Sequence, residues 1–311
     1  MLTIQASDVE SHLSWADLAQ AIEEANRLPR ARISDSFLTR ADQTLLLRSA
    51  WIDGLGMAVK VATIFPGNQL EQLPTVQGTV TLYDDQTGGP QAMVDFDLVT
   101  RYKTVGDSFL AASKLARPDC KKILIVGAGR IAATALAAYQ TMFPDASFEV
   151  WNHRSQSAEV LARRYASMGK RVGVVQDLRT GVAQADLICC ATLSKTPLIE
   201  GSWLRAGQHL DLIGAYRADM READDEVLRR GRLFVDSRDT TIHHIGELKI
   251  PIAAGVIDES AVEADFYDLD KGSFLRRSDE EITVFKNGGG AHLDLMTSRY
   301  ILASYTRLAR Q

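Results

Sequence analysis

A lysine lies in the middle of a strand-like run, GMAVKVATIF, at residues 56–65. Strand side chains alternate between faces, so Lys60 points to the same side as Ala58 and Ala62, and the valines between them point the other way. Lysine is rarely buried without a partner, so one interpretation is a solvated sheet face. The alternative is a cationic group beside two small residues that leave room for a ligand.

A glycine-rich turn follows an apolar strand in KILIVGAGRIAATALAAY. Gly127, Gly129 and Ala132 form G-x-G-x-x-A. The first glycine allows a tight turn, the second lets backbone approach a pyrophosphate, and the small third residue lets the helix pack on the strand. The helix N-terminus offers free N–H groups and the positive end of its dipole. We therefore predict dinucleotide binding; the alternative is a tight turn without a ligand.

The residues after the next strand, FEVWNHRSQSAE, bear on which dinucleotide is bound. An acidic residue here would bind the ribose 2′-OH of NAD, but Asn152 occupies the position, and His153 and Arg154 follow. Arginine can bind a 2′-phosphate through charge-assisted hydrogen bonds, whereas a carboxylate would repel it. NADP(H) is favoured, and NAD(H) stays open because Arg154 could simply be an exposed residue at a helix start.

Two kinds of segment must position these residues. In the first, a helix WADLAQAIEEANR, capped by Ser14, precedes the strand-like runs TLLLRSAW, GMAVKVATIF, GTVTLYD and QAMVDFD, which predict an antiparallel sheet. A helix TVGDSFLAASKLAR then ends at Pro118. From Lys121 onward strands and helices alternate, which predicts an α/β fold with a Rossmann-type doubly wound parallel sheet. A long amphipathic helix ends the chain.

The composition is that of an ordinary globular protein, with 311 residues, 46% hydrophobic and 24% charged. A net charge of −5 without a basic tract argues against nucleic-acid or anionic-membrane partners. The sequence has neither a signal-peptide pattern nor a membrane-length apolar run, so we expect a cytoplasmic protein. Cys120, Cys189 and Cys190 lack metal-ligand spacing, and we expect buried reduced thiols and no metal site.

These segments, in this order, resemble the ornithine cyclodeaminase/mu-crystallin family. The similarity rests on LPRARIS, AVKVATIFPGN, LPTVQGTV, VTRYKTVGDSFLAASKLARPD, ILIVGAGRIAATAL, LIGAYRADMREADDEVL, FVDS and ITVFKNGGGAHLDL, which cover nearly the whole chain. It implies a homodimer with a substrate-binding and dimerisation domain at residues 1–118, completed by the helix at 291–311. It also implies an NAD(P)-binding Rossmann domain at 119–290, with the active site between the domains.

By this resemblance Arg32 corresponds to the family arginine that holds the substrate carboxylate, Lys60 to the catalytic lysine, and Thr75 to a hydroxyl beside them. Lys103 stands where members usually carry an arginine, which exchanges a bidentate clamp for a point charge. Neighbouring positive charge favours the neutral form of a lysine, which would suit Lys60 to proton transfer near neutral pH. The residues expected to bind the nucleotide are Gly127, Gly129, Arg130, Ile131, Ala132, Asn152, His153, Arg154, Thr192, Gly214, Lys286, Asn287 and Gly288.

The substrate is suggested by two departures from the cyclodeaminases. Tyr216 stands where they have an aspartate for the distal amine of ornithine, and their glutamate is missing near Leu47 and Arg48. Burying that ammonium without a counter-charge would be costly. The resemblance therefore favours an NAD(P)H-dependent reductase of small cyclic imino acids, such as pyrroline-2-carboxylate or piperideine-2-carboxylate. Ornithine cyclodeaminase, an alanine-dehydrogenase-like activity and a non-catalytic NADPH-gated ligand-binding protein stay open as alternatives.

Three other polar features have plainer interpretations. His243 and His244 are expected in a surface or interdomain loop, because no ligand partner lies at metal-site spacing. Asp294 is expected to contribute helix-start electrostatics or a domain-packing contact rather than catalysis. The segment RADMREADDEVLRR is predicted to be a charged, solvated helix, although Glu222 within it could serve the site.

Overall fold

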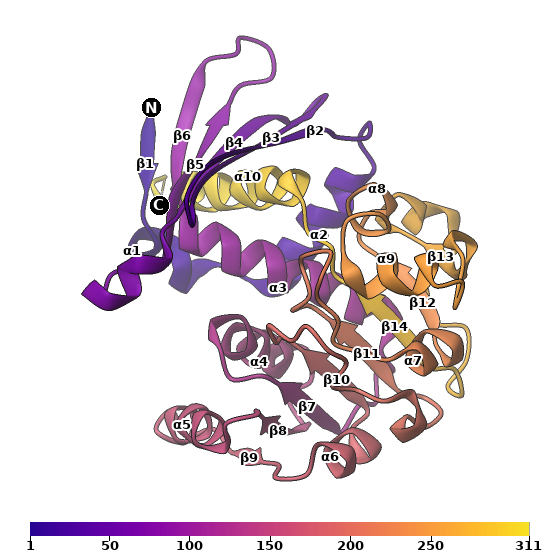
Figure 1. The fold of residues 1–311 in the computed structure, drawn as a ribbon. Helices are drawn as coiled ribbons and strands as arrows, with labels where there is room; N and C mark the ends of the chain where they lie inside the picture. Colours follow the sequence, from indigo (N-terminus) through magenta and orange to yellow (C-terminus); the bar gives the residue numbers. More distant parts are fainter. Residues whose placement is uncertain (311) are drawn as a thin grey trace. The chain divides into compact units, whose positions relative to one another are not determined.

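A computed structural model describes residues 1–310, which form two compact units (Figure 1). The first unit comprises residues 1–106 together with the chain from Gly290 onward, and the second comprises Asp107–Gly289. The chain leaves the first unit inside helix α3 (Phe96–Leu115) and returns to it just before helix α10 (Ala291–Leu308). The first border therefore lies within α3, whereas the sequence analysis places it after that helix, at residue 118.

The first unit is built on a six-stranded sheet in the order β1-β6-β5-β4-β3-β2. Neighbouring strands from β2 to β6 are antiparallel, and β1 adds to β6 in parallel, so the sheet is mixed rather than purely antiparallel. The bounds are β1 Leu2–Ile4, β2 Arg32–Arg40, β3 Gln43–Ile52, β4 Gly56–Ile64, β5 Val76–Tyr83 and β6 Pro90–Asp95. Sequence analysis missed β1 and β2; every residue of β2 is exposed, which removes the usual apolar signal.

Helices cover one face of this sheet. Helix α2 (Trp15–Asn26) begins as predicted at Ser14, whose hydroxyl accepts a hydrogen bond from the amide of Asp17. Helix α10 packs against β3, β4 and α2 (Figure 1). The shorter helices of the unit are α1 (Ala6–Val9), η1 (Glu10–His12) and η2 (Pro66–Glu71).

Helix α3 begins two turns earlier than the sequence predicts. The carboxylate of Asp95 accepts a hydrogen bond from the amide of Leu98 at 2.7 Å, which satisfies a free donor at the helix start. This earlier start makes Thr100 and Lys103 helical, three residues apart and therefore on one face of α3.

The second unit contains an eight-stranded parallel sheet in the order β13-β12-β14-β11-β10-β7-β8-β9. From β7 the chain adds β8 and β9 on one side, then returns to place β10 on the other side of β7. This reversal is the topological switch point of a doubly wound sheet, which confirms the predicted Rossmann-type fold. The bounds are β7 Lys122–Val126, β8 Ser147–Trp151, β9 Val172–Val174, β10 Leu187–Cys190, β11 His209–Leu212, β12 Arg232–Val235, β13 Val262–Ala264 and β14 Thr283–Lys286.

Apolar strands of this sheet form the core of the second unit. Leu124, Ile188 and Leu210, from three adjacent strands, are completely buried together. The helices are α4 (Arg130–Met142), α5 (Ser155–Ala166), α6 (Leu178–Gln184), α7 (Asp225–Arg230), α8 (Arg238–Thr241) and α9 (Gly246–Ala253), with short turns η3 (Gly201–Trp203), η4 (Glu259–Ala261) and η5 (Phe266–Lys271). Within residues 1–310, none of the helices combines the length and the apolar character that crossing a membrane requires.

The three cysteines are free and buried, as expected. Over the same described residues, no group of His, Cys, Asp or Glu side chains could hold a metal ion.

Candidate active site

Lys60 lies on the buried face of β4, between Ala58 and Ala62. Its side chain is 7% exposed, so the interpretation as a solvated sheet face is wrong. An ammonium group is buried only when it is paired and hydrogen-bonded. The question raised by the sequence therefore becomes which groups in the first unit provide that pairing.

The pairing comes from a carboxylate for which the sequence analysis expects helix-start electrostatics or a domain-packing contact. One oxygen of Asp294, in the first turn of α10, accepts a hydrogen bond from the ammonium of Lys60 at 3.0 Å. The other oxygen accepts from the ammonium of Lys103 on α3, also at 3.0 Å. Asp294 is 1% exposed and bridges the two lysines. We call Lys60, Lys103 and Asp294 the lysine cluster.

Each ammonium of the lysine cluster has one further acceptor. Lys60 donates to the hydroxyl of Thr100 at 2.8 Å, and its nitrogen lies 4.5 Å from the centre of the Phe96 ring. Lys103 donates to the carbonyl of Gly290 at 3.3 Å. Two acceptors and an aromatic face account for the three N–H groups of Lys60, whereas Lys103 has one N–H beyond its two acceptors.

An arginine on the neighbouring strand adds a second layer of charge. Arg48 of β3 pairs with Lys60 in the antiparallel ladder, and Asp35 of β2 pairs with Arg48. Directly opposite residues project from the same face of a sheet. The guanidinium of Arg48 binds the carboxylate of Asp35 at 2.6 and 2.9 Å, which offsets part of the positive potential that Arg48 adds. The lysine cluster, with two ammonium groups and one carboxylate, keeps one net positive charge.

Burial and charge act on the two ends of the cluster in different ways. For Lys103, burial together with repulsion from Lys60 and Arg48 outweighs the attraction of Asp294, and the pKa of the lysine falls to about 8. For Asp294, burial opposes ionisation, but Lys103, Lys60 and Arg48 together lower the pKa of the carboxyl below its usual value. At neutral pH the cluster thus holds an ionised carboxylate beside a lysine close to its titration point.

The structure does not bring Arg32 to the lysine cluster. Arg32 pairs with Trp51, and Trp51 with Met57, three residues from Lys60 along β4. An odd separation on a strand places side chains on opposite faces, so Arg32 lies on the other face of the sheet. Its side chain is 73% exposed, binds Asp53 at 3.3 Å and lines a surface cavity with Trp51 and Met57.

Thr75 is also apart from the lysine cluster. Its carbonyl accepts a hydrogen bond from the amide of Phe65, just beyond the end of β4, whereas Lys60 pairs with Val80 further along β5. The hydroxyl that contacts Lys60 belongs instead to Thr100. Of the four predicted catalytic residues, Lys60 and Lys103 are brought together by the fold.

In the second unit, the glycine-rich turn has the shape that a pyrophosphate requires. Gly127 follows β7 with φ of +120°, and a side-chain Cβ there would lie 2.6 Å from the carbonyl oxygen of Ala191. Gly129 caps α4 and has open space where a Cβ would be. Ala132 is completely buried behind the turn, Arg130 is exposed and Ile131 is half-buried. A backbone cradle with room beside it fits a dinucleotide.

The ends of two neighbouring strands in this sheet are tied together by Glu222. One carboxylate oxygen accepts hydrogen bonds from the amide and hydroxyl of Thr192, after β10, both at 2.8 Å. The other accepts from the amides of Gly214 and Ala215, after β11, at 2.6 and 3.2 Å. Glu222 is completely buried, so the predicted solvated helix is wrong for this part of the segment; α7 begins only at Asp225.

The predicted selectivity residues lie after β8, at the same edge of the sheet. Asn152 is half-buried and donates a hydrogen bond to the carbonyl of Arg154 at 3.1 Å. His153 and Arg154 are exposed, and Arg154 is the cap residue of α5. This segment therefore presents cationic and neutral groups, and no carboxylate, at the position that follows the second strand of the motif.

The loop after β14 is held by side chains of the second unit. Lys286 is completely buried and donates to the carbonyl of Leu212 at 2.7 Å, so its ammonium points into the interior. Asn287 donates to the hydroxyl of Ser108 at 3.0 Å, and the amide of Gly288 donates to Asp236 at 3.0 Å.

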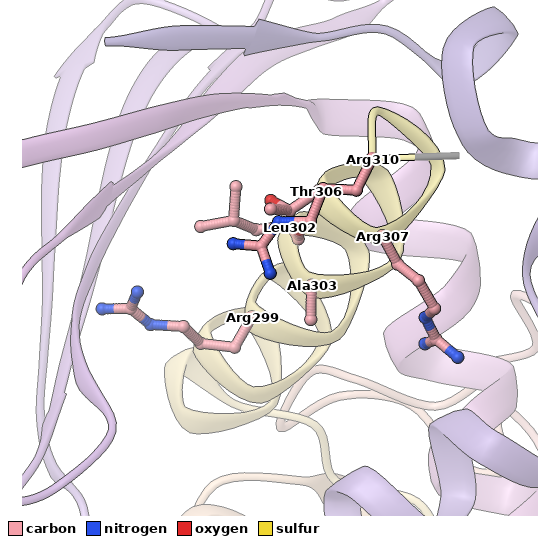
Figure 2. Close-up of a pocket in the computed structure, with 6 residues that line it drawn as sticks. All are labelled: Arg299, Leu302, Ala303, Thr306, Arg307 and Arg310. Atoms are coloured by element: carbon pink, nitrogen blue, oxygen red, sulfur yellow. The ribbon is translucent and has the colours of Figure 1, made fainter.

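A pocket on α10 is separate from the lysine cluster. Figure 2 shows it on the later turns of the helix, and its cavity volume is about 560 Å³. The guanidinium groups of Arg299 and Arg307 point in opposite directions rather than toward a common centre (Figure 2). The lining residues are Arg299, Leu302, Ala303, Thr306, Arg307 and Arg310.

The chain is similar to known proteins over nearly its whole length. The model of the ornithine cyclodeaminase/mu-crystallin family matches residues 1–307. The chain belongs to this family. The chain is 49% identical over 296 residues to a Delta(1)-pyrroline-2-carboxylate reductase of Paracoccus denitrificans, an alignment covering 94% of each chain. It is 27% identical to the ketimine reductase mu-crystallin of Mus musculus, over 80% of this chain and 76% of that one.

Two solved structures are similar to this chain over nearly its whole length. The Thermococcus litoralis Delta(1)-pyrroline-2-carboxylate reductase in complex with NADH and L-proline is 27% identical, with a TM-score of 0.88 over 99% of this chain and 98% of that one. An archaeal alanine dehydrogenase dimer with bound NAD is 26% identical, with a TM-score of 0.89 over 99% and 97% of the two chains.

Within this ornithine cyclodeaminase/mu-crystallin member, sequence reasoning missed Asp294, Thr100 and Arg48 as parts of the charged site. Two of the three had a weak signal in the sequence. Asp294 follows the glycine run in a buried helix turn, and Arg48 lies in an apolar strand at the position where the cyclodeaminase glutamate was sought. Tyr216, at the place of the cyclodeaminase aspartate, is 60% exposed.

Proposed function

We propose that the protein is an NAD(P)H-dependent reductase of small cyclic imino acids of the pyrroline-2-carboxylate or piperideine-2-carboxylate type. The observation that carries this proposal is the lysine cluster, a buried set of groups with one net positive charge. A cyclic imino acid has one carboxylate and one C=N bond, so its charge complements the cluster. The relatives named for the reduction of pyrroline-2-carboxylate support the same substrate class.

The residues of the first unit would bind and polarise the substrate. Lys60 and Lys103 can attract the carboxylate, and Arg48 adds positive potential from the next strand. An ammonium beside the substrate can also protonate the imine nitrogen during reduction. Ornithine, with a second ammonium, would meet cations in this part of the chain, which disfavours the cyclodeaminase alternative.

The residues of the second unit would bind the nucleotide. The turn at Gly127 and Gly129, with the N-terminus of α4, would hold the pyrophosphate. A bound nicotinamide nucleotide would supply the hydride for the C=N carbon. Glu222 would keep the loops that begin at Thr192 and Gly214 in fixed positions beside it. The backbone of Asn287 and Gly288 is proposed to contribute to the same site.

NADP(H) is proposed as the preferred nucleotide, and NAD(H) as a weaker one. The exposed Arg154 and His153 follow β8 at the place where NAD-binding folds carry an acidic residue. A guanidinium can bind the 2′-phosphate of NADP(H) bidentately. The NAD and NADH in the two solved relatives make this preference a point for direct measurement.

A homodimer is proposed as the working assembly, because the related archaeal alanine dehydrogenase is a dimer. The edge strand β2 supports this proposal, since Phe37 and Leu38 are each 61% exposed on it. Large apolar side chains on an open strand edge are a common feature of interfaces between copies.

The test is reduction of a cyclic imine by the purified full-length protein. With NADPH and pyrroline-2-carboxylate, the absorbance of reduced nicotinamide should fall and proline should form in equal amount; repeating the assay with NADH measures the nucleotide preference. Proline formed from ornithine without added reductant would instead identify a cyclodeaminase. Tight binding of NADPH without turnover of pyrroline-2-carboxylate, of piperideine-2-carboxylate or of pyruvate with ammonia would identify a binding protein.

A further inference from the structure

We infer that Lys103, rather than Lys60, gives the proton to the imine nitrogen. Asp294 is the positioning residue, which holds both ammonium groups in place through hydrogen bonds. This inference rests on the proposed function and assigns the acid within it. The imine carbon receives a hydride from the reduced nicotinamide, the imine nitrogen receives a proton from the Lys103 ammonium, and Lys103 is left neutral until solvent reprotonates it.

The geometry around the two nitrogens separates them. Lys60 has the hydroxyl of Thr100 at 2.8 Å, the carboxylate of Asp294 at 3.0 Å and the Phe96 ring at 4.5 Å, so all three of its N–H groups have a destination. Lys103 has Asp294 and the carbonyl of Gly290, the latter at the longer distance of 3.3 Å. Its remaining N–H is the one that a substrate nitrogen can accept without displacing an existing bond.

The charges around Lys103 favour release of a proton. Asp294 on α10 faces it as the single anion of the cluster, while Lys60 on β4 and Arg48 on β3 face it as cations. Arg48 is itself bound to Asp35 on β2. Burial together with these two cations lowers the pKa of Lys103 to about 8, close to the operating pH that general acid catalysis needs.

The residue type at this position has a chemical consequence. Arginine does not lose its proton in proteins. A lysine at position 103 therefore adds a titratable group that an arginine would not supply. Asp294 then has a defined task, because it keeps the Lys60 ammonium fixed while holding Lys103 in reach of the same site.

The main experiment measures kcat/KM for pyrroline-2-carboxylate against pH, with saturating NADPH, for wild type, Lys103→Arg, Asp294→Asn and the control Lys114→Arg. Lys114 lies on the same helix, away from the lysine cluster. Wild type and the control should lose activity tenfold per pH unit above about 8, where Lys103 becomes neutral. Lys103→Arg should be about 100-fold slower at pH 7, and its alkaline decline should be absent.

Asp294→Asn should move the start of the alkaline decline to lower pH, because the ammonium groups lose the anion that stabilises them. A purely structural loss would lower activity without moving that point. Lys103→Arg with the rate and pH profile of the wild type would overturn the inference while leaving the proposed function intact. A wild type that reduces no cyclic imine would instead remove the proposed function.

A binding measurement gives a second readout that does not depend on turnover. Pyrrole-2-carboxylate is a planar ring acid that cannot be reduced in this way, and its binding can be followed by calorimetry in buffers of different ionisation heat. At pH 8 about half of the Lys103 side chains are neutral, so the wild type should take up as much as about half a proton per ligand as the carboxylate binds beside Lys103, and Lys103→Arg should bind without that uptake. Equal proton uptake in both proteins would contradict the assignment to Lys103.

Discussion

Buried carboxylates behave differently in the two units. Asp294 in the first unit is 1% exposed and accepts hydrogen bonds from two ammonium groups. Asp211 in the second unit is completely buried and accepts from two hydroxyls, that of Tyr139 at 2.7 Å and that of Ser108 at 2.8 Å. The two carboxyl groups therefore share burial and differ in the charge of their partners.

The pKa values follow that difference. Burial raises the pKa of Asp211 to about 6, because neutral hydroxyls compensate only part of the lost hydration. Burial also raises the pKa of Asp236 to about 6, although its partners include the Thr241 hydroxyl and the Gly288 amide. For Asp294 the cations outweigh burial and the pKa falls. Of these three buried carboxyl groups, Asp294 accepts hydrogen bonds from ammonium groups, whereas Asp211 and Asp236 accept them from hydroxyl and amide groups that hold the second unit together.

Replacing Lys60, a partner of the first unit's buried carboxylate, should have the largest effect on catalysis. Lys60→Ala removes one of two cations from Asp294, and we expect kcat/KM for the imine to fall roughly 100- to 1,000-fold, since truncating one partner of a buried charge pair costs about 2–5 kcal/mol. Nucleotide affinity, measured by NADPH fluorescence, should stay near that of the wild type. The exposed Lys249→Ala serves as a control. Full turnover in folded Lys60→Ala protein would remove Lys60 from the site.

The buried carboxyl of Asp211 in the second unit should make the stability of the protein depend on pH. The folded pKa of Asp211 is above its usual value, so this group adds stability below about pH 4 that is lost as the pH rises through about 6. In Asp211→Asn that loss should be absent. The free energy of unfolding of the variant, relative to wild type, should therefore rise by roughly 2–3 kcal/mol from pH 4 to pH 8.

Urea unfolding at the two pH values measures the difference. Activity of Asp211→Asn should change little, because Asp211 belongs to the interior of the second unit. A relative stability that does not vary with pH would show that the buried carboxyl is ionised as readily as an exposed one, and the comparison between the units would lose its basis.

The smallest effect should come from the arginine that the structure places away from the cluster. Arg32 is 73% exposed on the opposite face of the sheet, so Arg32→Ala should change KM for the imine by less than about threefold, in the range of an exposed ion pair. Arg48→Ala should raise KM by about tenfold, since Arg48 shares a face with Lys60. Steady-state kinetics of both variants ranks them, and a large KM increase confined to Arg32→Ala would reverse the assignment.

Sequence analysis predicted the features that depend on residues close together in the chain. The G-x-G-x-x-A turn, the cap at Ser14 and the alternating second half depend on neighbouring residues, and the strands and helices predicted there are present. The segment RADMREADDEVLRR is an exception, because its helix begins only at Asp225. Lys60 and Lys103 could be selected because they depart from their surroundings or from a familiar motif. The strand β2 was missed because its polar, exposed sequence carries no apolar alternation.

The parts that sequence reasoning missed depend on contacts between distant positions. Asp294 binds Lys60 across 234 residues and Lys103 across 191 residues, and neither spacing leaves a periodic signal. Arg32 was misplaced relative to Lys60 because its face depends on the register of β2 against β3, which a single strand sequence does not fix. Thr100 was missed because α3 begins earlier than predicted, at the Asp95 cap, and this earlier start places Thr100 on the same helix face as Lys103.

A crystal structure of the protein with NADP⁺ and L-proline tests the central claim most directly. The account predicts the proline carboxylate within hydrogen-bond distance of Lys60 or Lys103, the proline nitrogen beside the side-chain nitrogen of Lys103, and the pyrophosphate against the amides after Gly127. Proline bound on the face of the sheet that carries Arg32, with no contact to the lysine cluster, would contradict this account.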